Sequence, residues 1–164
     1  MEAGEMFTKK TGMFGDSMRY VALAARQLLA VTFIIASAGH FTPDTIASAA
    51  HHGVPMAGVL VPLSGLIALA GGLSLLFGYH ARIGAGLLVL FLVPVTLTMH
   101  NFWAATDAAM FQGELMLFIR NVALLGGALL VMYSGAGSLS LDALMAEAEV
   151  LIAAEPVAEL DYVA

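Results

Sequence analysis

Two histidines, His40 and His100, have the side chains of this sequence best suited to chemistry. An imidazole can bind a metal, relay a proton or hydrogen-bond a quinone carbonyl near neutral pH. Each of the two stands where a long apolar stretch gives way to polar residues, so they can meet across a bundle of helices. There they could contact a quinone or serve as the two axial ligands of a haem. The simpler interpretation is that each is an interfacial histidine in contact with water.

Polar and aromatic residues that follow extend this candidate site, which comprises His40, His100, Asn101, Trp103, Glu114 and Arg120. Arg120 comes six residues after Glu114, or about 9 Å along a helix. An arginine inside a membrane is costly unless it is paired or hydrated, so it is a functional candidate. The acids expected to pair with it are Glu114, Asp107 and Asp44. Alternatively, Arg120 ties helices together or extends outward to the membrane surface.

Two further positions have simpler interpretations. Arg26 also lies within an apolar stretch, but no acid stands near it in the sequence, so we expect it to extend to lipid phosphate. Trp103 and Phe102 are typical of the aromatic belt at a membrane boundary. His51 and His52 are expected to lie on a loop.

Four apolar stretches must position these residues, and they cover residues 20–41, 57–78, 81–103 and 114–133. A helix of about 20 largely apolar residues crosses a hydrocarbon core of about 30 Å. Because lipid does not tolerate unpaired backbone groups, each stretch is predicted to be a helix. The small residues at 36–38, at the end of the first stretch, resemble a signal-peptide cleavage site. However, Arg26 and Gln27 interrupt the apolar stretch, so we interpret it as a retained span. The predicted fold is all-α, an integral membrane antiparallel four-helix bundle.

Composition favours the same class of protein. Hydrophobic residues make up 60% of the 164 residues and charged residues only 11%, against about 25% charged in a typical soluble domain. The net charge of −6 arises largely from acids after the last stretch, and with no basic patch it argues against nucleic acid as a partner. With no cysteine, the chain can form no disulfide and perform no thiol chemistry.

Basic residues predict the orientation in the membrane. Lys9, Lys10 and Arg19 precede the first span and Arg82 follows the turn after the second, whereas residues 42–56 and 104–112 contain no lysine or arginine. By the positive-inside rule, both termini are expected in the cytoplasm of a bacterium, with the chain in the inner membrane.

The chain divides into three predicted parts. Residues 1–19 form a cytoplasmic N-terminal extension, residues 20–134 the four-span bundle, and residues 135–164 an acidic cytoplasmic tail. Ser140 can cap a short amphipathic helix in this tail, with Asp142 in its first turn. Its apolar edge suits either the membrane surface or a partner protein, and the residues from Pro156 are expected to be loosely ordered.

Small residues are expected to let the spans approach closely. Gly65, Ala68 and Gly72 follow helical spacing in the second span, and this stripe can pack against another helix. Gly84, Gly126 and Gly127 can do the same in other spans.

In four places the sequence resembles the DoxX family of small bacterial and archaeal membrane proteins, and together these cover roughly residues 20–144. The first span ends in SAGHF at 37–41, and the second contains GLIALAGGL at 65–73, followed by Gly78 and Arg82. The third span contains PVTL at 94–97 and HNFW at 100–103, and the fourth leads to GAGSLSLDAL at 135–144. The order and spacing of these segments carry the resemblance, since much of each is glycine and aliphatic residues.

The resemblance implies a four-span bundle associated with redox membrane complexes, such as the membrane subunit of a thiosulfate:quinone oxidoreductase. Two positions depart from the family pattern: His40 stands where many relatives have lysine, and Ala68 where many have an intramembrane glutamate. Without that carboxylate an obvious proton acceptor is missing, which argues against direct redox catalysis by this chain.

We therefore expect an accessory subunit that anchors or stabilises a larger redox, photosynthetic or respiratory complex in the lipid bilayer. The alternative is a quinone-linked oxidoreductase subunit with quinone bound at the outer site, and a haem-binding bundle using His40 and His100 is a minor one. No covalently bound cofactor and no metal are expected. Transport has little support, because four spans without inverted repeats make a poor carrier.

Overall fold

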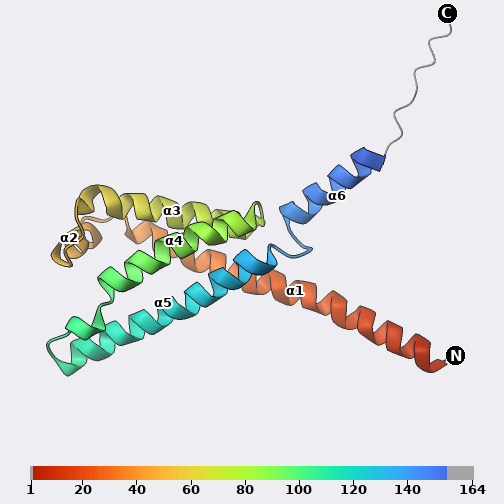
Figure 1. Cartoon of the computed structure of the whole chain (residues 1–164), viewed down its shortest axis with the longest axis horizontal. Coiled ribbons are helices and arrows are strands. Elements are labelled where there is room, and N and C mark those ends of the chain that lie inside the picture. The colour runs from red at the N-terminus through yellow and green to blue at the C-terminus, as the bar shows by residue number, and fades with distance from the viewer. Residues whose placement is uncertain (1, 155–164) are drawn as a thin grey trace, which may run out of the picture.

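The computed structural model describes residues 2–154 of the chain, with side chains from residue 17 onwards, and the predicted loose order from Pro156 lies outside them. Its elements, in chain order, are α1 (Glu2–Gly39), α2 (Pro43–His51), α3 (Ala57–Phe77), α4 (Ala81–Met99), the short 3-10 helix η1 (Phe102–Ala104), α5 (Ala108–Ser134) and α6 (Leu141–Ala154). The described part of the chain contains helices and no strand (Figure 1).

Four of these segments are long and apolar enough to cross a membrane: Ser17–Gly39, Ala57–Phe77, Ala81–Ala104 and Ala108–Ser134. This confirms the predicted all-α membrane protein with four spans. The two ends of the bundle differ in what they carry. The turn end contains the α3–α4 turn at residues 78–80 and the α5–α6 segment at 134–142. The loop end contains residues 40–56 and 100–107.

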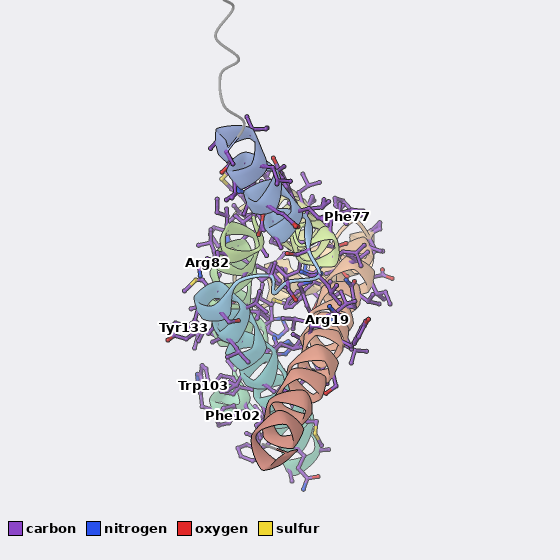
Figure 2. All side chains as sticks on the ribbon, turned by 90° about the vertical axis from the view of Figure 1, so that its right-hand side faces the viewer. Arg19, Phe77, Arg82, Phe102, Trp103 and Tyr133 are labelled. Carbon is purple, nitrogen blue, oxygen red and sulfur yellow. The ribbon has the colours of Figure 1, made fainter. Side chains whose placement is uncertain are left out.

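The spans pack in chain order. α1 packs on α3, α3 on α4 and α4 on α5, whereas α1 and α5 touch at few points. Figure 2 looks at the bundle from the turn end and shows α1 beside α3, and α5 beside α4. The core lies along this series of contacts and includes Ala30, Phe33, Ala68, Leu75 and Leu88. Because the contact between α1 and α5 is sparse, the bundle is partly open on that side.

Small residues set the close approach of α1 to α3, as predicted. A Cβ atom at Gly65 would lie 2.6 Å from His40 Cβ, and one at Gly72 would lie 2.9 Å from Ile34 Cγ1. Ala68 between them is fully buried. Gly84 likewise lies against α3, where a Cβ would meet Ser74. The expectation for Gly126 is wrong: nothing lies within 4 Å of a Cβ built there, because this residue faces outward.

The segment between the first two spans holds a helix that we did not predict. Thr42 caps α2 with its hydroxyl, which accepts a hydrogen bond from Thr45 N at 3.4 Å, and Pro43 and Asp44 occupy the first turn. Asn, Asp, Ser or Thr followed by proline is a known helix-start signal that could have revealed it. His51 therefore ends a helix instead of lying on a loop, and His52 follows it as the C-cap.

α6 forms as predicted. Ser140 Oγ accepts a hydrogen bond from Ala143 N at 3.1 Å and so caps its first turn. The helix has no buried residue and points away from the bundle in Figure 1. Its apolar side chains Leu144, Val150, Leu151 and Ile152 are all more than half exposed.

Candidate functional site

A histidine and a carboxylate meet at the loop end. His100 directly follows α4, and its Nδ1 lies 3.0 Å from Oε2 of Glu114 in the second turn of α5. Both side chains are largely buried, at 16% and 22% exposed. Their pairing follows from the antiparallel packing of α4 and α5, since the two residues are 14 positions apart in the chain. A carboxylate beside an imidazole fixes its tautomer and leaves the other ring nitrogen available to a ligand.

A cluster of aromatic rings lies at the same end of the bundle. Phe102 in η1 makes edge-on contacts with Trp103, Phe111 and Phe118, with ring centroids 5.1–5.7 Å apart. Trp103 also contacts Phe118 at 6.0 Å and is 58% exposed, which suits an indole at a membrane boundary. Figure 2 shows Phe102 and Trp103 side by side. Asn101 precedes η1 and is half-buried, with no side-chain hydrogen bond to the helix.

His40 lies apart from His100. It follows the C-terminus of α1, packs against Gly65 of α3, and places its ring 5.3 Å from that of Phe91 in α4. Phe91 is nine residues before His100, which corresponds to about 14 Å along α4. His40 Nδ1 is 3.0 Å from the carbonyl of Ala36. Each histidine thus makes its contacts at a different depth, and no ring contact or hydrogen bond between them occurs in the described structure.

Arg120 does not pair with the acids expected for it. Glu114 is bound to His100, Asp107 caps α5 by accepting a hydrogen bond from Met110 N at 2.8 Å, and Asp44 is exposed in the first turn of α2. Arg120 itself is exposed and has no hydrogen bond or ion pair among the described residues. The expected pairing is wrong because Arg120 lies on a different face of α5 from Glu114. Asn121, the next residue, is buried.

The expectation for Arg26 is also wrong. Its side chain is 4% exposed and turns into the protein, where Nη1 donates to the carbonyl of Ala136 at 2.6 Å and Nη2 to that of Leu139 at 2.8 Å. These carbonyls lie more than a hundred residues after Arg26 in the sequence, so no local pattern could have indicated the contact. An arginine within a span often has a polar partner, and this rule could have indicated that Arg26 has one within the protein.

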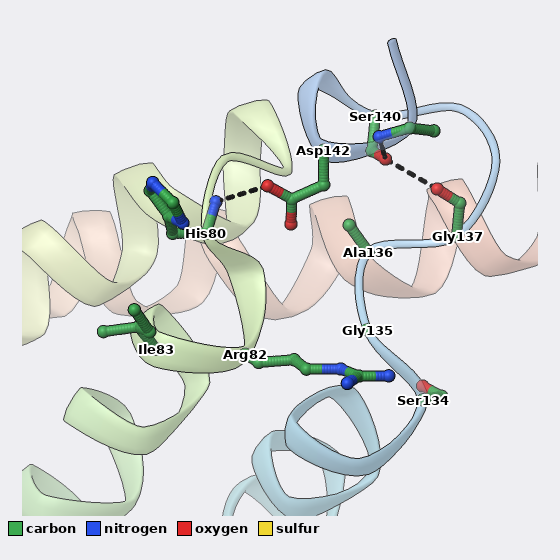
Figure 3. Close-up of a pocket in the computed structure, with 10 residues that line it drawn as sticks. His80, Arg82, Ile83, Ser134, Gly135, Ala136, Gly137, Ser140 and Asp142 are labelled. Carbon is green, nitrogen blue, oxygen red and sulfur yellow. Dashed lines mark hydrogen bonds between the residues drawn. The ribbon is translucent and has the colours of Figure 1, made fainter. Parts of the chain in front are cut away.

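Asp142 completes a network at the turn end that sequence reasoning missed. Its carboxylate accepts hydrogen bonds from His80 N at 2.7 Å and Ala81 N at 3.0 Å, so it caps the N-terminus of α4 (Figure 3). Gly78 has φ 64°, and a Cβ there would lie 2.6 Å from Ser140 Cβ and would also meet Arg26 Nη1. The network therefore ties α1, the α3–α4 turn and the start of α6 together.

The two ends differ in what they can do. The turn-end network uses its polar groups on backbone partners and is chiefly structural. The loop-end pair of His100 and Glu114 has hydrogen-bonding capacity beside aromatic rings and suits a polar ring-shaped ligand or proton exchange. Within the described residues, no group of three His, Asp or Glu side chains could hold a metal ion.

Comparisons with known proteins point to a family of membrane proteins. The DoxX family model matches residues 21–101, which run from α1 to the end of α4. Inner membrane protein YqjF of Escherichia coli (strain K12) is 30% identical over 124 residues, which are 75% of this chain and 90% of that protein. No solved structure is significantly similar to the chain.

Proposed function

This chain belongs to the DoxX family of small membrane proteins, and we propose that it is a non-catalytic subunit that anchors or stabilises a larger redox or energy-converting membrane complex. The link to redox complexes is supported by what the family resemblance implies. The relative from Escherichia coli is named an inner membrane protein, which supports a place in the bacterial cytoplasmic membrane. The basic residues Arg19 and Arg82 favour the cytoplasmic side for the turn end.

The observation that carries the proposal is the position of Arg120. It lies 12 residues after Ala108 and 14 before Ser134, or about 18 Å and 21 Å from the two ends of α5. It is therefore close to the middle of a span, on the outer surface of the described structure. A charge at the centre of a bilayer costs at least about 2.5–3.5 kcal/mol when it faces lipid.

Extension to the membrane surface relieves that cost only in part. Half of a hydrocarbon core is about 15 Å thick, and an extended arginine side chain covers only about half of this distance. The neighbouring side chains Met116 and Ile119 are 70% and 56% exposed and offer no polar group. A polar or acidic group on a neighbouring subunit would satisfy Arg120, and a partner helix at this face would supply it.

Two other features support a subunit without catalysis of its own. Ala68 is fully buried between α1 and α4, where the glutamate of many relatives would stand, so this position provides no proton acceptor. α6 presents Val150, Leu151 and Ile152 outside the bundle, and a partner could cover them.

Replacing Arg120 with leucine is expected to release the chain from its complex. A tagged chain purified from native membranes in mild detergent should bring the other membrane subunits with it in stoichiometric amounts. Because loss of one partner of a buried charge pair costs about 3–5 kcal/mol, their recovery should fall more than about tenfold in Arg120→Leu. Quantitative mass spectrometry of the purified material measures this ratio.

Met116→Leu is the matched control, since Met116 is exposed one turn earlier on α5 and carries no charge. It should recover the subunits as the natural chain does. A truncation after Met145 keeps Ser140 and Asp142 and separates docking through α6 from docking through α5. Purification of the natural chain alone, or only with copies of itself, would contradict the proposal.

A quinone-linked oxidoreductase subunit is the second candidate, and the His100–Glu114 pair favours it. The pair is partly buried at the loop end beside Phe102, Trp103 and Phe118. A histidine can donate a hydrogen bond to a quinone carbonyl, and aromatic rings can stack on the quinone.

Trp103 is the only tryptophan in the sequence and offers a direct test. If this site binds quinone, decylubiquinone should quench Trp103 fluorescence in a saturable manner. A buried acceptor left without its donor costs about 1–3 kcal/mol, so His100→Ala should weaken the apparent affinity by about fivefold or more. His80→Ala at the turn end is the control. Linear quenching of equal slope in the natural chain, His100→Ala and His80→Ala would exclude the quinone site.

A further inference from the structure

A cleft of about 480 Å³ separates α1 from α5 on the open side of the bundle. α1 contributes Ala25, Leu28 and Leu29 to its walls, and α5 contributes Leu124, Gly127, Leu130 and Val131. Residues 134–137 close the cleft at the turn end. The walls are mainly apolar, and the volume is typical of sites that bind small molecules, which measure about 300–1,000 Å³.

The cleft has the depth of one membrane leaflet. From Leu124 to Gly135 is 11 residues, which corresponds to about 16 Å along α5. Half of a hydrocarbon core is about 15 Å. An occupant that enters from the open side and lies along α5 would therefore extend from the turn end to the middle of the membrane, as a single acyl chain does.

The cleft is too narrow for another helix where α1 and α5 touch. A Cβ atom at Gly127 would lie 3.5 Å from Leu29 Cδ1, so the two helices are in near contact there. A helix with side chains is about 10 Å across and cannot enter at this level. A hydrocarbon chain is thinner and can lie in the groove alongside this contact.

The closed end of the cleft is polar and positively charged. Arg26 lines it, is 4% exposed, and has a buried Nε with no hydrogen-bond partner among the described residues. On the other side of residues 134–137, the exposed Arg82 extends toward Gly135, where a Cβ would lie 3.4 Å from Arg82 Nε (Figure 3). The carboxylate of Asp142 is bound to His80 N and Ala81 N. Two guanidinium groups and one engaged carboxylate leave this end with an excess of positive charge.

We propose that the α1–α5 cleft binds one acyl chain of an anionic phospholipid, with its headgroup at the turn end attracted by Arg82. The apolar walls accommodate the chain through one leaflet. Arg82 provides the attraction for the negative headgroup. The buried Nε–H of Arg26, which has no partner among the described residues, provides a donor for an ester oxygen at the closed end of the cleft. This site is independent of the subunit role proposed for Arg120.

Native mass spectrometry of the full chain in delipidated detergent micelles tests the proposal. The probes are phosphatidylglycerol and phosphatidylcholine with identical acyl chains. We expect one phosphatidylglycerol per chain, bound about fivefold more tightly than phosphatidylcholine, since one arginine near a membrane surface has about that effect on an anionic lipid. Arg82→Gln should remove most of this preference. Equal affinity for both lipids in the natural chain would overturn the headgroup assignment.

Adjacent glycines provide a matched pair for the acyl-chain site. Gly127→Leu fills the cleft opposite Leu29, whereas Gly126→Leu adds the same side chain where nothing lies within 4 Å. Phosphatidylglycerol affinity should fall by at least about tenfold in Gly127→Leu and stay unchanged in Gly126→Leu, because only the first occupies the space of the lipid chain.

Ala25→Leu, with Ala24→Leu as its control, narrows the cleft from α1 if Gly127→Leu fails to fold. Unchanged phosphatidylglycerol affinity in a folded cleft-filling variant would overturn the proposal. Displacement of the lipid by an equimolar amount of decylubiquinone would also overturn it, because the cleft would then be a quinone site.

Discussion

Replacing Arg26 with alanine is expected to lower the free energy of unfolding by about 3 kcal/mol, because the variant loses two hydrogen bonds from a charged donor. These bonds, to the carbonyls of Ala136 and Leu139, connect α1 to the segment after α5. Without them, residues 135–142 should separate from α1. Unfolding by sodium dodecyl sulfate in mixed micelles measures the first effect, and hydrogen exchange across residues 136–142 measures the second.

Arg26→Lys is the informative comparison for this network. A lysine keeps the charge but cannot present the planar fork of donors that reaches two carbonyls at once. The free energy of unfolding of Arg26→Lys should therefore lie between that of the natural chain and that of Arg26→Ala. If the unfolding and the hydrogen exchange of Arg26→Ala equalled those of the natural chain, the guanidinium would not hold the segment in place.

Gly71→Val is expected to have an effect of similar size through a different cause. A Cβ at Gly71 would lie 2.7 Å from Leu88 Cδ2 and 2.8 Å from the carbonyl oxygen of Gly84. Because Gly84 O belongs to the backbone, α3 and α4 must separate to admit the larger side chain. Overpacking of this kind costs about 1–3 kcal/mol, and the same unfolding measurement in micelles would detect it.

Gly58→Val is the control on the same helix. Nothing lies within 4 Å of a Cβ at Gly58, so its effect should stay within about 0.5 kcal/mol, as for other exposed substitutions. Equal destabilisation by the two variants would mean that the general loss of glycine, and not the α3–α4 contact, determines stability.

Local features of the sequence were enough to predict the membrane class and the number of spans. An apolar run long enough to cross a bilayer has few alternatives to a helix, because lipid offers no partner to the backbone. The stripe of Gly65, Ala68 and Gly72 was likewise predictable, since helical periodicity places the three residues on one face. The cap of α6 by Ser140 depends only on neighbouring residues, and so it too was correctly predicted.

The start of α2 had a local signal that we did not use. Thr42, Pro43 and Asp44 are the cap, first position and first turn of a helix. The segment was interpreted as a loop because it lies between two spans, although its own residues favour a helix.

The polar contacts were decided by tertiary structure alone. The packing of α4 on α5 joins His100 to Glu114 and leaves Arg120 outside. The packing of α1 on α3 and α4 places His40 at another depth. Arg26 and Asp142 find their partners 110 and 62 residues away in the chain. Length, apolarity and periodicity are properties of one helix at a time, so the sequence by itself determined four membrane-spanning helices. Which polar groups meet depends on how those helices are rotated and staggered against one another, and only the folded bundle decides that.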